Sequence, residues 1–117
     1  MAIEHVLAVA PVADFGTALP WYERLFGRAP DNRPMDSLAE WRAADTGGVQ
    51  VWQDPDRAGT ALVDIAVGGL PADVGALGGR GLEPEAIQEV NKGVRLSAVT
   101  DPDGNRITLI GGFRPVY

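Results

Sequence analysis

The sequence predicts an α+β domain in which one pattern, a strand, a helix and then two or three strands, occurs twice. Three observations carry this prediction. Short apolar runs bounded by Gly and Pro alternate with two stretches of helical character. Each helical stretch is followed by a glycine that can end it, Gly27 in the first half and Gly81 in the second. A polar connector at residues 54–59 divides the chain near its midpoint.

The first half is expected to open with a strand over residues 3–10, bounded by Pro11. Asp14 can cap a helix over residues 15–26. Pro20 fits that helix only if it lies in the first turn or if the helix starts later. After the helix we expect a turn-rich loop, a strand, a hairpin turn and a second strand, at residues 30–34, 37–44, 45–48 and 48–53.

The second half repeats the order. We expect a strand, a glycine-weakened helix, two strands around a turn, a tight turn and a last strand, at residues 61–67, 71–82, 85–90, 93–100, 101–105 and 106–110. Two sheets that each bury one face against a helix leave their other faces to build a shared concave surface. Such a groove is where a ligand would bind.

Composition excludes several classes of function. The 117 residues suit one domain, and 45% hydrophobic with 22% charged residues is typical of a soluble globular protein. No apolar run approaches the roughly 18 residues that cross a bilayer, and the first residues lack the basic start of a signal peptide, so the expected location is cytoplasmic. The absence of cysteine excludes disulfides and thiolate sites, and the net charge of -6 argues against nucleic-acid binding.

Several segments, taken in order, resemble the vicinal-oxygen-chelate superfamily, which includes glyoxalases, bleomycin-resistance proteins and dioxygenases. The segments are the opening strand with His5, the Trp21-Tyr22 pair of the first helix, the joint at residues 49–67, and the closing turn and strand at residues 101–109. The resemblance implies one domain of two βαβββ modules, about 1–57 and 58–117. It also implies that they form a curved, partly open mixed sheet with the helices outside.

The resemblance also implies where a metal ion would bind. Metal-dependent members hold a divalent ion with side chains from the first and last strand of each module, which here correspond to His5, Trp52, Asp64 and Thr108. Trp cannot ligate and a neutral Thr hydroxyl is a poor ligand, so only His5 and Asp64 remain as weak candidates. A register shifted by one residue would bring in Gln50 or Gln53. We therefore expect no bound cofactor, the alternative being a divalent metal ion.

The candidate ligand site is an apolar, aromatic groove. Trp41 and Trp52 lie on neighbouring expected strands and are predicted to share one face with Leu7 and Val9. The alternatives are that the tryptophans belong to the core or a dimer interface, and that His5 is a structural, hydrogen-bonded residue. Asp64 either faces the groove or water, or pairs with an arginine such as Arg106. The full set of ligand-binding candidates is His5, Leu7, Val9, Trp41, Gln50, Trp52, Asp64, Arg106 and Thr108.

The favoured function is a metal-independent protein that binds an apolar or aromatic small molecule, of the kind that sequesters an antibiotic. The alternative is a metal-dependent lyase, isomerase or dioxygenase acting on a substrate with neighbouring oxygens. A third possibility is a cofactor-independent enzyme with His5 or Asp64 as a base. The resemblance implies a homodimer, and it leaves open whether the modules are exchanged between the chains.

Overall fold

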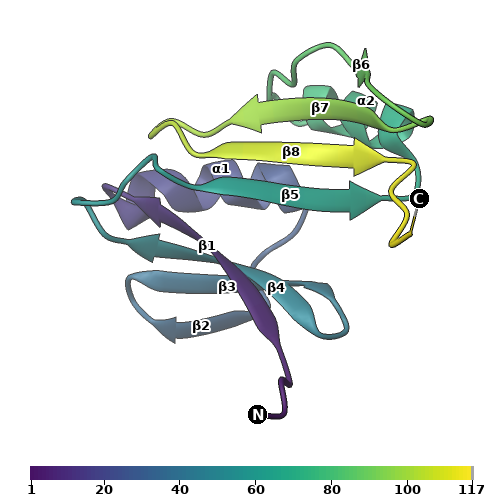
Figure 1. Cartoon of the computed structure of the whole chain (residues 1–117). Helices are drawn as coiled ribbons and strands as arrows, with labels where there is room; N and C mark the ends of the chain where they lie inside the picture. The colour runs from purple at the N-terminus through teal and green to yellow at the C-terminus, as the bar shows by residue number, and fades with distance from the viewer. Residues whose placement is uncertain (117) are drawn as a thin grey trace.

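The computed structural model describes residues 1–116, and within them it has two helices and eight strands in two similar halves (Figure 1). The first half contains β1 (Val6–Val12), α1 (Phe15–Phe26), β2 (Asn32–Met35), β3 (Leu38–Ala44) and β4 (Gly47–Gln53). The second half contains β5 (Leu62–Val67), α2 (Leu70–Gly79), β6 (Gln88–Glu89), β7 (Arg95–Thr100) and β8 (Arg106–Gly111). The order strand, helix, three strands therefore occurs twice.

Each half forms its own four-stranded sheet, and the two sheets have the same topology. The strand order is β1-β4-β3-β2 in the first sheet and β5-β8-β7-β6 in the second. In each sheet the opening strand runs parallel to the closing strand, and the other pairs are antiparallel. The sheets are mixed and do not close into a barrel, so the predicted α+β fold class is confirmed.

Helix α1 is set by its caps and by one apolar face. The Asp14 side chain accepts a hydrogen bond from the Gly16 backbone N–H, and Gly27 ends the helix in the left-handed conformation at φ 71°. Pro20 lies inside the helix, so neither placement expected for it was right. The helix tolerates this proline because its other face is fixed by buried side chains at helical spacing, namely Phe15, Ala18, Tyr22 and Leu25.

Several expected strand and helix boundaries were wrong. Part of the predicted loop at residues 30–34 is strand β2. Pro34 fits in this strand because β2 is at the edge of the sheet, where the outer side forms no hydrogen bonds to another strand. Pro11 lies inside β1, the opposite edge of the same sheet, for the same reason. The strand expected over residues 85–90 is reduced to β6, and α2 begins and ends earlier than residues 71–82.

A buried polar network joins the two halves. It lies where the end of β1, in the first half, meets the turn before β8, in the second half. Asn105 is fully buried, and its amide donates to the Pro11 carbonyl and to Asp101, while its oxygen accepts from the Ala61 N–H. The Tyr22 hydroxyl donates to Asp101 Oδ2 at 2.6 Å. Burial, followed by the hydrogen bond to Asp101, raises the pKa of Tyr22, so the hydroxyl stays protonated and remains a donor.

A second set of hydrogen bonds joins the two helices. The Arg80 guanidinium, at the end of α2, donates from Nε to the Arg24 carbonyl and from Nη2 to the Leu25 carbonyl. These carbonyls belong to the last turn of α1, where unpaired C=O groups carry partial negative charge. The positive side chain of one module therefore caps the helix of the other. Neither helix within residues 1–116 is long and apolar enough to span a membrane.

Candidate functional site

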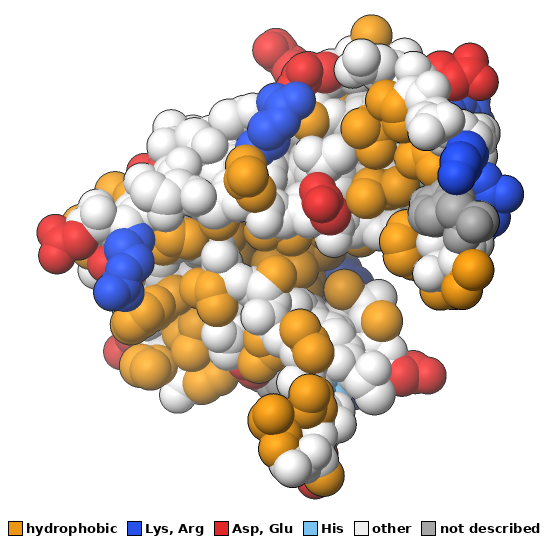
Figure 2. Space-filling view, in the orientation of Figure 1, with side chains coloured by type: hydrophobic (Ala, Val, Ile, Leu, Met, Phe, Trp, Pro, Cys, Tyr) orange, Lys and Arg blue, Asp and Glu red, His pale blue; other side chains and the backbone are white. Residues whose placement is uncertain are grey.

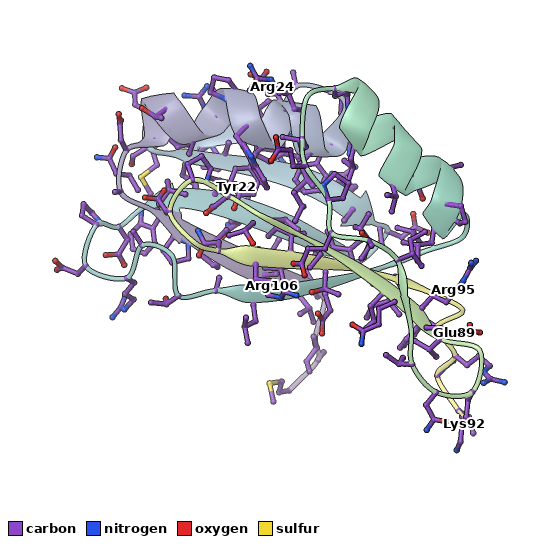
Figure 3. The ribbon with its side chains drawn as sticks, turned by 90° about the horizontal axis from the view of Figure 1, so that it is seen from above. Tyr22, Arg24, Glu89, Lys92, Arg95 and Arg106 are labelled. Carbon is purple, nitrogen blue, oxygen red and sulfur yellow. The ribbon has the colours of Figure 1, made fainter. Side chains whose placement is uncertain are left out.

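Each sheet has one face packed on helices and core and one open face, and both open faces lie on the same side of the molecule. Figure 3, seen from above, shows the two helices together on one side of the strands. In Figure 1 the helices lie behind the sheets, so the reader looks onto the open faces. Figure 2 has the same orientation, and hydrophobic side chains gather there over the lower sheet and over the right-hand part of the upper one. These open faces are the candidate ligand-binding surface.

The open face of the first sheet follows from strand register, because side chains alternate between faces along each strand. Across β1, β4 and β3 it consists of three rows: Leu7, Gly48 and Arg42; then Val9, Gln50 and Glu40; then Pro11, Trp52 and Leu38. A small hollow of about 110 Å³ lies at one end of this face, and its lining includes His5, Leu7 and Glu40. Four of the predicted ligand-binding residues are therefore in this face: Leu7, Val9, Gln50 and Trp52.

The open face of the second sheet has the matching layout. Across β5, β8 and β7 its rows are Leu62, Arg106 and Thr100; then Asp64, Thr108 and Ala98; then Ala66, Ile110 and Leu96. A hollow of about 260 Å³ on this face is lined by Asp64, Arg106 and Thr108 among others. These three predicted residues are thus brought together. The hollows on the two sheets share no lining residue, so within one chain these two hollows stay separate.

Trp41 was wrongly predicted to share a face with Trp52. Trp41 pairs with Val49 and Trp52 pairs with Leu38, which puts the two indoles on opposite faces of the sheet. Trp41 is fully buried on the helix side, where it stacks on Phe26 at 5.1 Å between ring centroids and donates from Nε1 to the Arg28 carbonyl. Trp41 is therefore a core residue, whereas Trp52 is 38% exposed on the open face.

The predicted metal-ligand positions do not assemble into a metal site. Asp64 and Thr108 are direct neighbours across β5 and β8, but Trp52 lies opposite Pro11 and His5 precedes β1. Over the described residues, no three His, Asp or Glu side chains gather closely enough to hold an ion. One carboxylate beside a neutral hydroxyl is too poor a donor set for a divalent metal, so the residues present do not fit one.

The ion pair on the second open face differs from the one suggested by the sequence. Arg106 does not pair with Asp64. It makes a two-pronged contact with Glu85, from Nη1 to Oε2 at 2.6 Å and from Nη2 to Oε1 at 3.3 Å. Glu85 is not among the candidates named from the sequence, because the turn that brings it to β8 was not visible there. Asp64 is exposed on the open face.

Sequence reasoning also missed Glu40, which lies in the middle row of the first open face. It is half-buried, and its carboxylate accepts a hydrogen bond from the Gln50 side-chain amide. The alternation of β3 could have found it only if the next residue, Trp41, had been assigned to the core, because neighbouring residues of a strand point to opposite faces. Gln50, chosen for a different reason, is its direct partner across the strands.

Solved structures of other proteins are similar to this chain over nearly its whole length. A glyoxalase/bleomycin resistance protein from Catenulispora acidiphila is 31% identical, with a TM-score of 0.86, over 92% of this chain and 96% of that one. TnmS3, an antibiotic binding protein from Streptomyces sp. CB03234, is 25% identical with a TM-score of 0.74, over 95% and 98% of the two chains. No family model and no curated protein sequence matches the chain.

A third structure shows the same fold at lower identity. It is a bleomycin-binding protein in complex with bleomycin, 19% identical with a TM-score of 0.76, over 93% of this chain and 98% of that one. In all three cases nearly the whole of both chains is matched, so the likeness covers both halves and the joint between them.

Proposed function

This chain belongs to the glyoxalase/bleomycin resistance proteins of the vicinal-oxygen-chelate superfamily, and on that premise we propose that it binds an apolar or aromatic small molecule on its open faces without a metal ion. The observation that carries the proposal is Trp52. A partly exposed indole in the end row of the first open face, flanked by Leu38 and Pro11, offers a flat apolar surface for a ring to stack on.

The polar groups of the two faces suit binding better than metal chemistry. Gln50 on the first face, and Thr108 with Arg106 on the second, provide hydrogen-bond donors beside apolar side chains, and a few such polar groups orient a ligand in a mostly apolar site. The names of two similar structures, an antibiotic binding protein and a bleomycin-binding protein, point in the same direction. Sequestration of an antibiotic requires tight binding and no reaction, so this donor set would be sufficient for it.

A homodimer is part of the proposal, because a single chain leaves its site shallow. The hollows of about 260 Å³ and 110 Å³ fall below the roughly 300–1,000 Å³ that sites for drug-sized ligands occupy. The open side also exposes large hydrophobic side chains, including Leu7, Val9 and Leu62. A second copy facing this side would bury them and deepen the groove.

The dimer can be tested at Leu62, which is 82% exposed on the open face. Wild-type protein at micromolar concentration should sediment at about twice the chain mass, and Leu62→Lys should shift it toward the monomer because an ammonium would be buried without a partner. Ala72→Lys, at an exposed position of α2 on the helix side, is the matched control and should remain dimeric. A monomeric wild type would contradict the dimer.

Trp52 provides the test of ligand binding. Bleomycin and the flat neutral ring acridine, titrated separately, should quench the intrinsic fluorescence, and Trp52→Phe should lessen the response because the other indoles, Trp21 and Trp41, lie on the helix side. Isothermal titration calorimetry with and without EDTA should give the same affinity. Affinity that depends on Zn, Ni, Mn or Fe(II) would favour the metal-dependent enzyme, and tight binding that leaves every Trp signal unchanged would place the site elsewhere.

A further inference from the structure

The first open face carries a carboxylate whose charge is not balanced within the described chain. Glu40 lies in the middle row between Gln50 and the edge strand β2, and it is half-buried. The described ion pairs are Arg28–Asp31, Arg57–Asp54 and Arg106–Glu85, and Glu40 belongs to none of them. Its hydrogen-bond donor is the neutral Gln50 amide. A negative charge therefore remains on a largely apolar surface.

The charged and titratable groups that face Glu40 can be named. Arg42 lies two residues further along β3 on the same face, and it is exposed and forms none of the described ion pairs. His5 lines the same small hollow but makes no described hydrogen bond to the carboxylate. Asn32, the Cα partner of Glu40 on β2, is neutral. Among the described contacts, neither of these two cationic candidates forms an ion pair or a hydrogen bond with the carboxylate.

The second open face provides an internal comparison. There an exposed glutamate from the segment before β6, Glu85, makes the two-pronged contact with Arg106. The two faces share strand order and layout, but the glutamate on the second face is paired with an arginine, whereas Glu40 on the first face has only the neutral Gln50 amide as its described partner. A half-buried carboxylate keeps unused acceptor positions, and removing water from it is costly unless a positive donor replaces the water. Ligand binding at Trp52 would remove that water.

Trp52 lies one row from Glu40, on the adjacent strand. Such diagonal neighbours across a sheet are about 7–8 Å apart at Cα, within reach of one medium-sized molecule. An indole face and a carboxylate attract the same kind of group, since the ring is electron-rich on its face and the carboxylate accepts charge-assisted hydrogen bonds. An anionic ligand would be repelled by one and gain nothing from the other.

We propose that Glu40 selects the charge of the ligand: the molecule bound on the first open face carries a positively charged nitrogen next to a flat apolar ring, the nitrogen at Glu40 and the ring on Trp52. This inference rests on the proposed binding function and specifies its ligand class as an aromatic organic cation. The Gln50 amide positions the carboxylate for that contact.

The test uses three probes built on one ring system: the cation 10-methylacridinium, neutral acridine at pH 7.5, and the anion acridine-9-carboxylate. Calorimetric titration of the full chain should give the cation an affinity about tenfold above acridine, with the anion weakest. Glu40→Gln, which keeps the shape and removes the charge, should lower the affinity for the cation about tenfold and leave that for acridine unchanged. Glu89→Gln, on exposed β6, removes the same net charge and should change neither by more than about twofold.

The outcomes separate this inference from the function on which it rests. If acridine and the cation bind wild type equally, or if Glu40→Gln weakens both alike, charge selection is wrong while ring binding stands. If Glu89→Gln lowers the cation affinity as much as Glu40→Gln, the effect is one of net charge and the assignment to Glu40 fails. If none of the three rings binds, the proposed binding of flat aromatic ligands fails, and the charge selection fails with it. Thermal unfolding followed by circular dichroism should show Glu40→Gln as stable as wild type.

Discussion

Asn105→Ala is expected to lower the free energy of unfolding by about 3–4 kcal/mol, because it removes three hydrogen bonds from a fully buried joint. The Pro11 carbonyl and the Ala61 N–H would lose their side-chain partner, and the Asp101 carboxylate would lose one donor. Each buried group left without a partner costs about 1–3 kcal/mol. Two of these three groups lie in or beside the opening strands of the two modules.

Urea unfolding of the wild type and the variant measures this loss from the shift in midpoint at constant slope. Asn32→Ala, the same substitution at an exposed position of β2, should change stability by less than about 0.5 kcal/mol. A loss below about 1 kcal/mol for Asn105→Ala would mean that water replaces the amide and that the joint is less important than its burial indicates. The same variant, if folded, also tests whether the joint fixes the position of one open face relative to the other.

Gly59→Ala is expected to destabilise the chain by about 2–4 kcal/mol, for a steric reason at the same joint. Gly59 has φ 81°, and a Cβ atom there would lie 2.1 Å from the backbone oxygen of Asp103. The connector between the two modules thus passes directly against the closing turn of the second module. The atoms that this Cβ would meet belong to the backbone of Asp103 and Gly104, so they cannot rotate away. A shift of Gly59 would also weaken the hydrogen bond that its N–H donates to the Pro11 carbonyl.

Gly75→Ala in α2 provides the opposite control. A Cβ atom there would meet nothing within 4 Å, and the residue is helical without a positive φ. This substitution should stabilise the chain by about 0.4–1 kcal/mol, because alanine restricts the unfolded state and favours helix. Chemical unfolding of both variants measures these two changes in the free energy of unfolding. Equal losses at the two positions would show that glycine content in general, not the close approach at the joint, determines the response.

Local signals in the sequence determined the larger part of the fold. Asp14 and Gly27 begin and end α1 as expected, because capping depends on neighbouring residues in the chain. The tight turn before β8 is present, and Asp101 explains its strength by accepting three successive backbone N–H groups in it. The predicted superfamily follows from the order of such segments, and it is confirmed.

Errors arose where a residue's partner lies far away in the sequence. The prolines at positions 11 and 34 were taken as strand breakers, but both strands are edges, and a sequence does not reveal which side of a strand is unpaired. The separation of Trp41 from Trp52 depends on the pairing register between β3 and β4. A difference of one residue moves a side chain to the other face, and turn residues alone do not fix the register.

For the candidate site, the sequence by itself determined the residue types that are available: no cysteine, one histidine, and candidates such as Trp52 and Asp64. Tertiary structure alone decided which of them meet. In the folded chain Asp64 lies beside Thr108, and both are separate from the hollow that His5 lines. Arg106 forms an ion pair with Glu85, and the hydrogen-bond partner of Glu40 is the neutral Gln50 amide. The physical reason is that charge pairing and face assignment depend on contacts across strands and between modules, and these are set by packing of the whole chain.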